Sequence, residues 1–252
     1  MSQQSNSFTY PAAWAAFRNQ LSRGMTPRTL QWAHDIGLVG DHDNVLERMG
    51  RSFNPESYAG WLYPSTRDVR ALRILCDFVL WATALDDELE RAGPACSDDG
   101  RQELLLSCAA LLRGTAPGSP ALQKYVAGFR DLSARLDEVV DPSYLPSWRA
   151  RLLARMADNH ASVVSQEHRA YRDWQDLEFY AAVRPDSSGL IPYLTFIEVM
   201  EGCPLSPAAA DDPRLSRLHQ VTALIFGLFN DVMSLDKERT GSPAFNAVLI
   251  VE

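Results

Sequence analysis

The sequence predicts an all-α protein with a single domain. Apolar residues recur at helical spacing in one segment after another, and short stretches rich in proline, glycine, asparagine and serine separate these segments. No convincing series of alternating apolar and polar residues predicts strands. With 252 residues and 46% hydrophobic content, the chain can bury a substantial core. We therefore expect one helical bundle over 1–252, with no interdomain linker, internal repeat or low-complexity segment.

The apolar spacing places the helices along the chain, because side chains three or four positions apart share one face of a helix. Turn residues mark the breaks, as at Asn54-Pro55, Tyr63-Pro64 and Asp141-Pro142. Pro185 also indicates a break before Gly189, since proline cannot continue a helix without losing a hydrogen bond. The predicted helices are 14–21, 27–35, 44–49, 66–91, 101–112, 120–138, 144–166, 177–183, 190–200 and 213–238.

Charge and composition exclude several classes of protein. The chain carries 24 Lys and Arg against 32 Asp and Glu, a net charge of −8, whereas a nucleic-acid partner is normally met by a basic surface. The four cysteines are scattered without a CxxC pair, and the five histidines show no zinc spacing. The polar N-terminal segment has no signal-peptide features, and no uninterrupted apolar run approaches the roughly 18 to 20 residues of a membrane span. We expect a cytoplasmic protein without stable membrane insertion.

Two polar segments hold oxygen-bearing side chains at intervals of one helical turn. In the first, Asp86 and Glu90 are four positions apart. In the second, Asn230, Ser234 and Glu238 form a ladder on one helix face. Carboxylate, amide and hydroxyl oxygens suit Mg²⁺, which keeps some waters and completes its shell with substrate phosphate. The spacing therefore predicts two halves of a magnesium-diphosphate site.

Each segment also has a simpler interpretation as a solvated helix end or a polar stripe. The residues before them argue for function. The run 71–85 before Asp86 is mostly apolar, and so is the run 224–229 before Asn230. Carboxylates at the end of a buried helix are costly unless a cation or hydrogen bonds compensate. This context favours the metal site.

The two motifs resemble those of the class I terpene synthases, in particular the bacterial cyclases, which carry an aspartate-rich DDxx(D/E) segment and an NDxxSxxKE segment. A third match is an arginine 46 positions before Asn230, Arg184, which is similar to the family's diphosphate-sensing arginine and is followed by a helix-break loop. The resemblance implies metal ligands at Asp86, Asp87, Glu90, Asn230, Ser234 and Glu238, diphosphate contacts at Arg184 and Lys237, and a backbone carbonyl at Ser188 or Gly189 that senses the substrate.

The resemblance implies a reaction in which three Mg²⁺ ions, with Mn²⁺ as an alternative, bind the diphosphate of a linear prenyl substrate. Loss of the diphosphate leaves an allylic cation, which needs a dry cavity with aromatic faces. Farnesyl diphosphate (C15) is the expected substrate, and a cyclic terpene is the expected product. The candidate ring residues near the motifs are Phe78, Trp81, Tyr193, Phe196, Phe226 and Phe229, each of which is equally well explained by core packing.

Two departures from the family pattern leave alternatives open. Residues Thr83, Ala84 and Leu85 stand where many relatives have phenylalanine, so a wider pocket for a C20 substrate, geranylgeranyl diphosphate, remains an alternative. The apolar segment 244–252 ends without a cap, which suggests a domain lacking its C-terminal helices. An inactive fragment is therefore a further alternative, as is a chain-elongating prenyltransferase, although that class carries two aspartate-rich motifs. A homodimer is a candidate assembly.

Overall fold

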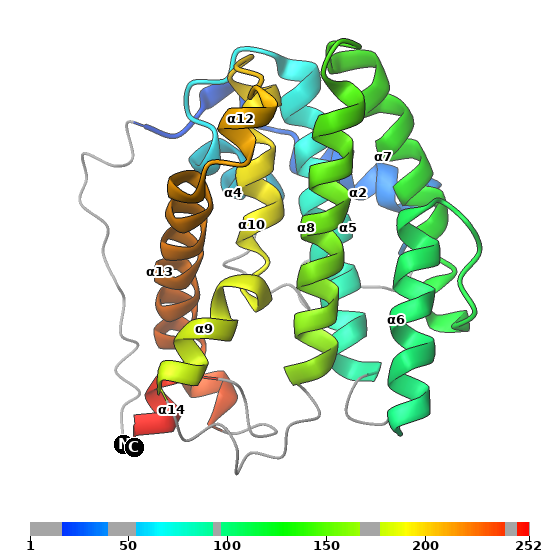
Figure 1. The fold of residues 1–252 in the computed structure, drawn as a ribbon. Helices are drawn as coiled ribbons and strands as arrows, with labels where there is room; N and C mark the ends of the chain where they lie inside the picture. Colours follow the sequence, from blue (N-terminus) through cyan, green and yellow to red (C-terminus); the bar gives the residue numbers. More distant parts are fainter. Residues whose placement is uncertain (1–16, 40–53, 93–96, 167–176, 240–245, 252) are drawn as a thin grey trace, which may run out of the picture.

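The computed structural model describes residues 17–39, 54–92, 97–166, 177–239 and 246–251. Figure 1 shows these residues as a bundle of helices, and no strand occurs in the described ranges. The predicted all-α class is therefore confirmed. The described helices are the 3₁₀ turns η1 (Gln20–Ser22) and η3 (Pro120–Leu122) and the α-helices α2 (Thr26–Asp35), α4 (Pro55–Leu62), α5 (Val69–Ala92), α6 (Asp98–Leu112), α7 (Tyr125–Val139), α8 (Leu145–Gln166), α9 (Leu177–Ser187), α10 (Leu190–Thr195), α11 (Ile197–Met200), α12 (Pro207–Ala210), α13 (Pro213–Glu238) and α14 (Ala247–Val251).

Helix α5 lies at the centre of the bundle and contacts α2, α4, α7 and α8. Helices α5, α8 and α13 all run from the upper end of the bundle to its lower end in Figure 1. As a result, the aspartate-rich segment at the end of α5 and the second motif at the end of α13 lie at the same end of the molecule. Helix α9 begins at this end and packs against both α8 and α13.

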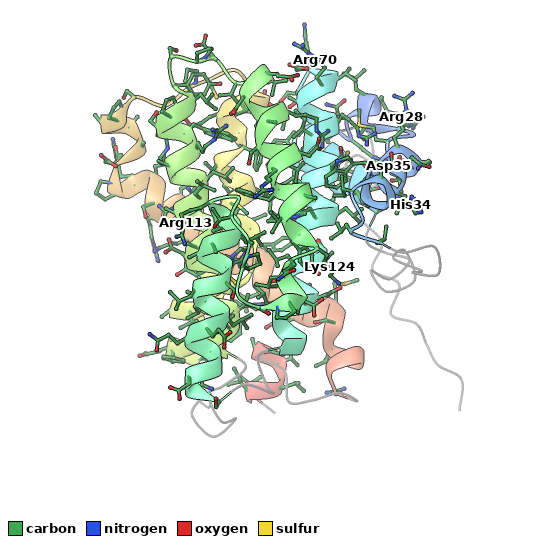
Figure 2. All side chains as sticks on the ribbon, turned by 90° about the vertical axis from the view of Figure 1, so that its right-hand side faces the viewer. Arg28, His34, Asp35, Arg70, Arg113 and Lys124 are labelled. Carbon is green, nitrogen blue, oxygen red and sulfur yellow. The ribbon has the colours of Figure 1, made fainter. Side chains whose placement is uncertain are left out.

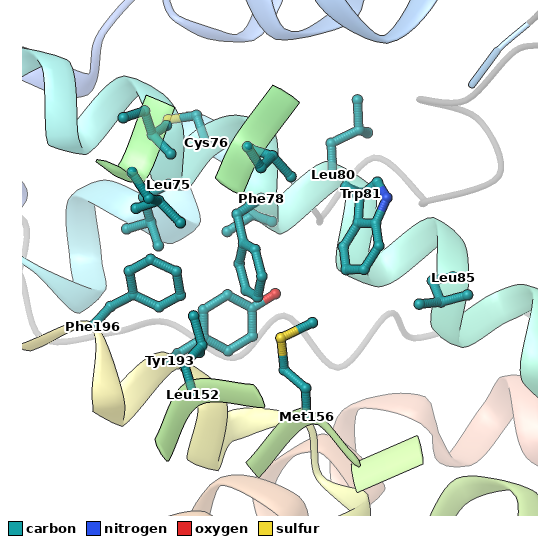
Figure 3. Close-up of a cluster of buried hydrophobic side chains, with 14 of the residues drawn as sticks. Leu75, Cys76, Phe78, Leu80, Trp81, Leu85, Leu152, Met156, Tyr193 and Phe196 are labelled. Carbon is teal, nitrogen blue, oxygen red and sulfur yellow. The ribbon is translucent and has the colours of Figure 1, made fainter. Parts of the chain in front are cut away.

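The core around α5 is built from large aromatic and sulfur-containing side chains. Trp81 is fully buried, and its Nε1 donates to the Tyr125 carbonyl at 3.0 Å. Gly128 on α7 makes room for the indole, because a Cβ there would lie 2.8 Å from Trp81 Cδ1. The close-up in Figure 3 shows Tyr193, Phe196 and Met156 gathered near Phe78 of α5.

A buried group of ion pairs fastens α5 to its neighbours. Asp77 is fully buried and accepts from Arg73 and Arg135, both at 2.9 Å. Arg135 also pairs with Asp131 at 2.8 Å, and Asp131 accepts from Trp32 Nε1 at 2.7 Å. Buried carboxylates need such partners, since an unpaired charge in a core is strongly destabilising. Charged side chains such as Arg70, Arg113 and Lys124 lie on the outside of the bundle (Figure 2).

Several predicted boundaries are corrected by the structure. Helix α4 occupies residues where a break was predicted, because Asn54 caps it by accepting from the Ser57 amide at 3.1 Å and Pro55 takes its first position. The predicted helix 120–138 is divided into η3 and α7, and 190–200 is divided at Phe196. Residues 66–68 are not helical, and α12 was not predicted.

The N-terminal predictions have mixed outcomes. Residues 17–19 are turn or extended, and only the short η1 follows, so the described part of the predicted helix 14–21 is wrong. The helix predicted over 27–35 corresponds to α2. The helix predicted over 44–49 lies outside the described residues. At the other end, the bounds predicted for 213–238 match α13.

Helix α13 carries an uncovered apolar stripe. Leu218, Ile225, Leu228 and Val232 are 61%, 63%, 40% and 59% exposed and follow one another at heptad-like intervals with Val221. Within the described chain, Pro213–Leu235 is the one stretch long and apolar enough to cross a membrane, by length and composition alone. One such helix does not by itself indicate a span.

Candidate active site

The second motif occupies the last three turns of α13. Asn230 is exposed, whereas Asp231 is 1% exposed. Ser234 lies one turn after Asn230, and its Oγ is buried without a hydrogen-bond partner among the described residues. The side chains of Lys237 and Glu238 lie outside the described part of the structure, although their backbone belongs to α13. The described members of the triad, Asn230 and Ser234, therefore share one helix face.

Arg184 of α9 meets this face. Its Nη2 donates to Asp231 Oδ1 at 2.6 Å, to Asn230 Oδ1 at 3.1 Å and to the Gly227 carbonyl at 3.4 Å. Its Nε is buried and has no hydrogen-bond partner among the described residues. A guanidinium has five N–H donors in a planar fork, which suits an anion with several oxygens.

Asp231 is held from several sides. Its Oδ2 accepts from the Tyr180 hydroxyl and, at 2.7 Å, from the Ala247 amide at the start of α14. Its backbone carbonyl accepts from Asn246 Nδ2 at 2.8 Å. Burial, followed by the hydrogen bond to Asp231, raises the pKa of Tyr180, so this hydroxyl remains a donor at neutral pH.

Gly227 allows the close approach of α9 to α13. A Cβ at Gly227 would lie 2.7 Å from Arg184 Cγ and 2.8 Å from its Nε. Contacts this short do not occur between real side chains, so any larger residue would displace the arginine. A small residue three positions before Asn230 is therefore part of the site.

The helix break lies later than the sequence predicted. Helix α9 continues through Pro185 to Ser187, and the chain turns only at Gly189, whose φ of +71° is left-handed. The Ser188 hydroxyl donates to the Pro185 carbonyl at 2.9 Å and accepts from the Leu190 amide at 3.3 Å. The prediction that Pro185 ends the helix is wrong, because the proline is tolerated in the last turn, while the glycine makes the turn.

The aspartate-rich segment ends α5. Asp86 and Asp87 are half-buried, and the side chain of Glu90 lies outside the described residues. Glu88 points to a different neighbour: its carboxylate pairs with Lys124 at 3.0 Å and accepts from the Tyr125 hydroxyl at 3.5 Å. Glu88 thus ties the end of α5 to the start of α7.

A path of ring contacts connects the two motif helices. Phe78 lies two turns before Asp86, and its ring centroid is 5.4 Å from that of Tyr193. Tyr193 is 5.4 Å from Tyr58, which is 6.4 Å from Phe226, one turn before Asn230. We call the rings of Phe78, Tyr193, Tyr58 and Phe226 the aromatic layer. Each motif begins one or two turns after this layer along its own helix.

The environment of Tyr193 includes Asp86 of α5. Burial raises the pKa of Tyr193, and the nearby Tyr58, Tyr63 and Asp86 add to this effect. Figure 3 shows the Tyr193 ring, with its hydroxyl, beside the Phe78 ring of α5.

The candidate rings differ in their surroundings. Phe196 is fully buried between Phe78 and Trp148, at centroid distances of 4.9 and 5.4 Å. Trp81 is fully buried against α7. Packing alone accounts for both. Phe78, Tyr193 and Phe226 belong to the aromatic layer between the motif helices, and Phe229 is partly buried one position before Asn230.

The described donors fit a hard divalent cation. Ser234 Oγ is a buried hydroxyl with no protein partner in the described chain. Such a group is costly unless a ligand or an ion binds it. Asn230 Oδ1, one turn away, retains a lone pair beside the hydrogen bond from Arg184. No group of three or more His, Cys, Asp or Glu side chains converges in the described ranges. A ladder containing Asn and Ser would not form such a group.

Sequence reasoning missed four residues of this site: Tyr58, Tyr180, Gly227 and Asp231. Asp231 had a signal, since it sits beside Asn230 within the motif. The other three had none, because their roles depend on which helices become neighbours.

Comparisons with known proteins agree with this geometry. Residues 77–252, more than half of the chain, match the model of terpene synthase family 2, C-terminal metal binding. The chain is 27% identical over 245 residues to (+)-(1(10)E,4E,6S,7R)-germacradien-6-ol synthase of Streptomyces pratensis, covering 96% of this chain and 67% of the relative. It is 28% identical over 224 residues to (+)-T-muurolol synthase ((2E,6E)-farnesyl diphosphate cyclizing) of Streptomyces clavuligerus, covering 86% of this chain and 51% of the relative. The chain thus spans about half to two thirds of these relatives.

Solved structures share the fold. Germacradien-4-ol synthase from Streptomyces citricolor superimposes with a TM-score of 0.64 at 20% identity, over 93% of this chain and 72% of that one. Wild-type cucumene synthase gives a TM-score of 0.69 at 18% identity, over 94% of this chain and 79% of that one. With the family model matched over both motifs, the chain belongs to the class I terpene synthases of the bacterial cyclase type.

Proposed function

We propose that this protein catalyses the divalent-metal-dependent ionisation and cyclisation of a linear prenyl diphosphate to a terpene, with release of diphosphate. The observation that carries the proposal is the arrangement at the end of α13. There Arg184 donates to Asn230, which shares a helix face with Ser234, whose buried hydroxyl has no partner among the described residues. Cationic and oxygen donors together suit a metal-bound diphosphate.

The metal ligands in this proposal are Asn230, Ser234 and Glu238 on α13 and Asp86, assisted by Asp87 or Glu90, on α5. When bound, Mg²⁺ ions, three in number, supply Lewis acidity at the leaving diphosphate. The protein's part is to hold oxygen donors on two helices whose ends lie at the same end of the bundle. Mn²⁺ is an alternative ion with similar ligand preferences.

Arg184 and Lys237 bind the diphosphate in this proposal. The allylic carbon–oxygen bond breaks heterolytically, and the bonding electron pair leaves with the diphosphate. Fixed cationic donors stabilise the charge that develops there more in the transition state than in the ground state. Ser188 and Gly189 lie at the turn that follows Arg184, where a shift of the arginine would be transmitted to the start of α10.

The aromatic layer then faces the allylic cation. The Phe78, Tyr193 and Phe226 rings offer cation–π stabilisation without a strong nucleophile, and burial keeps the Tyr193 hydroxyl neutral. Ring closure and loss of a proton from the cation complete the reaction. A C15 substrate is supported by the muurolol synthase, whose name specifies farnesyl diphosphate.

The test is incubation of the protein with Mg²⁺ and C10, C15 or C20 prenyl diphosphates, followed by analysis of volatile products and released diphosphate. We expect a cyclic C15 product that disappears when EDTA is added. A cyclic C20 product would move the substrate assignment to geranylgeranyl diphosphate. Longer prenyl diphosphates would indicate chain elongation. No turnover with any substrate would contradict the proposal for this chain.

A further inference from the structure

We infer that Asp231 is a positioning residue that fixes the guanidinium of Arg184 for diphosphate, with Tyr180 as its support. The inference rests on the proposed function and adds to it a residue outside the expected metal and diphosphate ligands. Both side chains of the pair are buried: Arg184 is 11% exposed and Asp231 is 1% exposed.

The pair is too well enclosed to be a surface ion pair. The distance from Arg184 Nη2 to Asp231 Oδ1 is 2.6 Å, which is short for a charge-assisted hydrogen bond. A carboxylate this buried is costly unless its oxygens are satisfied. Two further residues offset this cost, because the Tyr180 hydroxyl on α9 and the Ala247 amide of α14 both donate to Oδ2.

The two oxygens of the Asp231 carboxylate have different partners. Donors at Oδ2 keep the group from rotating, so Oδ1 remains directed at Arg184. The Asn246 side chain holds the backbone of the same residue through the Asp231 carbonyl at 2.8 Å. Gly227, one turn before Asp231, allows the alkyl stem of the arginine to lie directly on α13. The guanidinium is therefore fixed through Nη2.

Asp231 differs from the expected metal ligand Asn230 in its burial and in its partners. Asn230 is exposed and accepts from Arg184 at 3.1 Å, whereas Asp231 is buried beneath it and is fully engaged with protein donors. Loss of the Asp231 charge should therefore free the arginine rather than remove a ligand. The consequence is weaker binding of diphosphate that depends on Arg184 being present.

The experiment measures the affinity of inorganic diphosphate in the presence of Mg²⁺ by calorimetry, for the wild type, D231N, R184Q and the double variant. We expect D231N to weaken binding about tenfold, and R184Q to weaken it at least as much. Because Asp231 acts through Arg184, adding D231N to R184Q should change the affinity less than twofold. Wild-type affinity in D231N, or a similar tenfold loss in both backgrounds, would overturn the inference.

A matched control separates positioning from stability. Asp77 is also fully buried and paired with two arginines, but in the α5–α7 network. D77N should lower the melting temperature and leave diphosphate affinity unchanged. If D231N does not fold, Tyr180→Phe removes only one donor to Oδ2 and should weaken diphosphate severalfold, an effect that R184Q should abolish. An unchanged affinity in Y180F would then contradict the inference.

The same measurement separates this inference from the proposed function. A wild-type protein that does not bind diphosphate with Mg²⁺ would contradict the proposed function and the inference together. A wild type that binds diphosphate, with D231N binding equally well, would contradict only the role of Asp231.

Discussion

Gly227 and Arg184 lie in direct contact across the α9–α13 interface. A Cβ at Gly227 would be 2.7 Å from Arg184 Cγ, so the absence of a side chain on α13 is what lets the arginine reach Asn230 and Asp231. The position of the expected diphosphate sensor thus depends on a glycine in the middle of a helix.

Gly227→Ala is expected to reduce turnover by at least tenfold, because the new methyl group displaces Arg184 from its contacts. Helix propensity changes in the opposite direction, since alanine favours a helix interior by about 1 kcal/mol over glycine. Steady-state kinetics and circular dichroism would measure both effects. Gly128→Ala is the control, because its Cβ would collide with Trp81 in the core and should lower stability without affecting diphosphate binding. Equal activity in G227A and the wild type would contradict the assignment of Arg184.

Ser234→Ala is expected to preserve or raise stability while lowering metal-dependent turnover. The Oγ has no hydrogen-bond partner among the described residues, so its removal relieves a buried polar group worth about 1 to 3 kcal/mol. Thermal unfolding without metal and turnover as a function of Mg²⁺ concentration would show the two effects. Ser107→Ala should lower stability and preserve turnover, because the Ser107 hydroxyl on α6 accepts from the Ser119 amide at 2.9 Å and belongs to neither motif. Loss of stability in S234A with unchanged activity would mean that this serine is structural.

Phe78→Leu and Trp81→Leu should differ in their effects. Phe78 belongs to the aromatic layer with Tyr193, so its replacement should change the product distribution more than the rate of ionisation. Trp81 packs against Gly128 and donates to a backbone carbonyl, so its replacement should cost about 2 to 4 kcal/mol of stability. Product analysis and denaturant unfolding would distinguish them. An unchanged product profile in F78L would place that ring in ordinary core.

The buried His160 on α8 should make the folded protein less stable in mild acid. Burial lowers the pKa of this side chain to about 4, below its usual value near 6.5. Between these values the unfolded chain binds a proton that the folded protein does not bind. Stability should therefore fall as the pH is lowered through this window, by about 3 kcal/mol in total.

Denaturant unfolding at several pH values would measure this contribution. His160→Leu should show a shallower pH dependence than the wild type. His34→Gln, on the exposed surface in Figure 2, should retain the wild-type dependence. An identical pH dependence in H160L would show that another group is responsible.

Helix α13 illustrates how much local sequence can decide. Asp212 caps it by accepting from the Arg214 amide at 2.8 Å, Pro213 occupies its first position, and apolar residues recur along it, so its bounds could be predicted. Its register also places Asn230 and Ser234 on one face, because a helix fixes the relation of residues four apart. Whether Glu238 and Lys237 complete the site stays a prediction, since their side chains lie outside the described residues.

The positions of Pro55 and Pro185 did not by themselves decide where a helix begins or ends. Asn54-Pro55 begins α4, although the same pair of residues is typical of a turn, and Pro185 lies within α9. In both cases local chemistry allows two outcomes. The neighbours decide between them, since α4 packs on α5 and α9 packs on α13.

The sequence by itself determined the helical class, the periodic bounds of α13 and the ligand types of both motifs, because these follow from interactions within a few residues of chain. Only the tertiary structure decided that Asp231 turns inward to Arg184, that Gly227 admits the arginine, and that Tyr58 connects the rings of α10 and α13. Those relationships join residues far apart in the chain, and packing between helices, rather than spacing along one of them, sets their geometry.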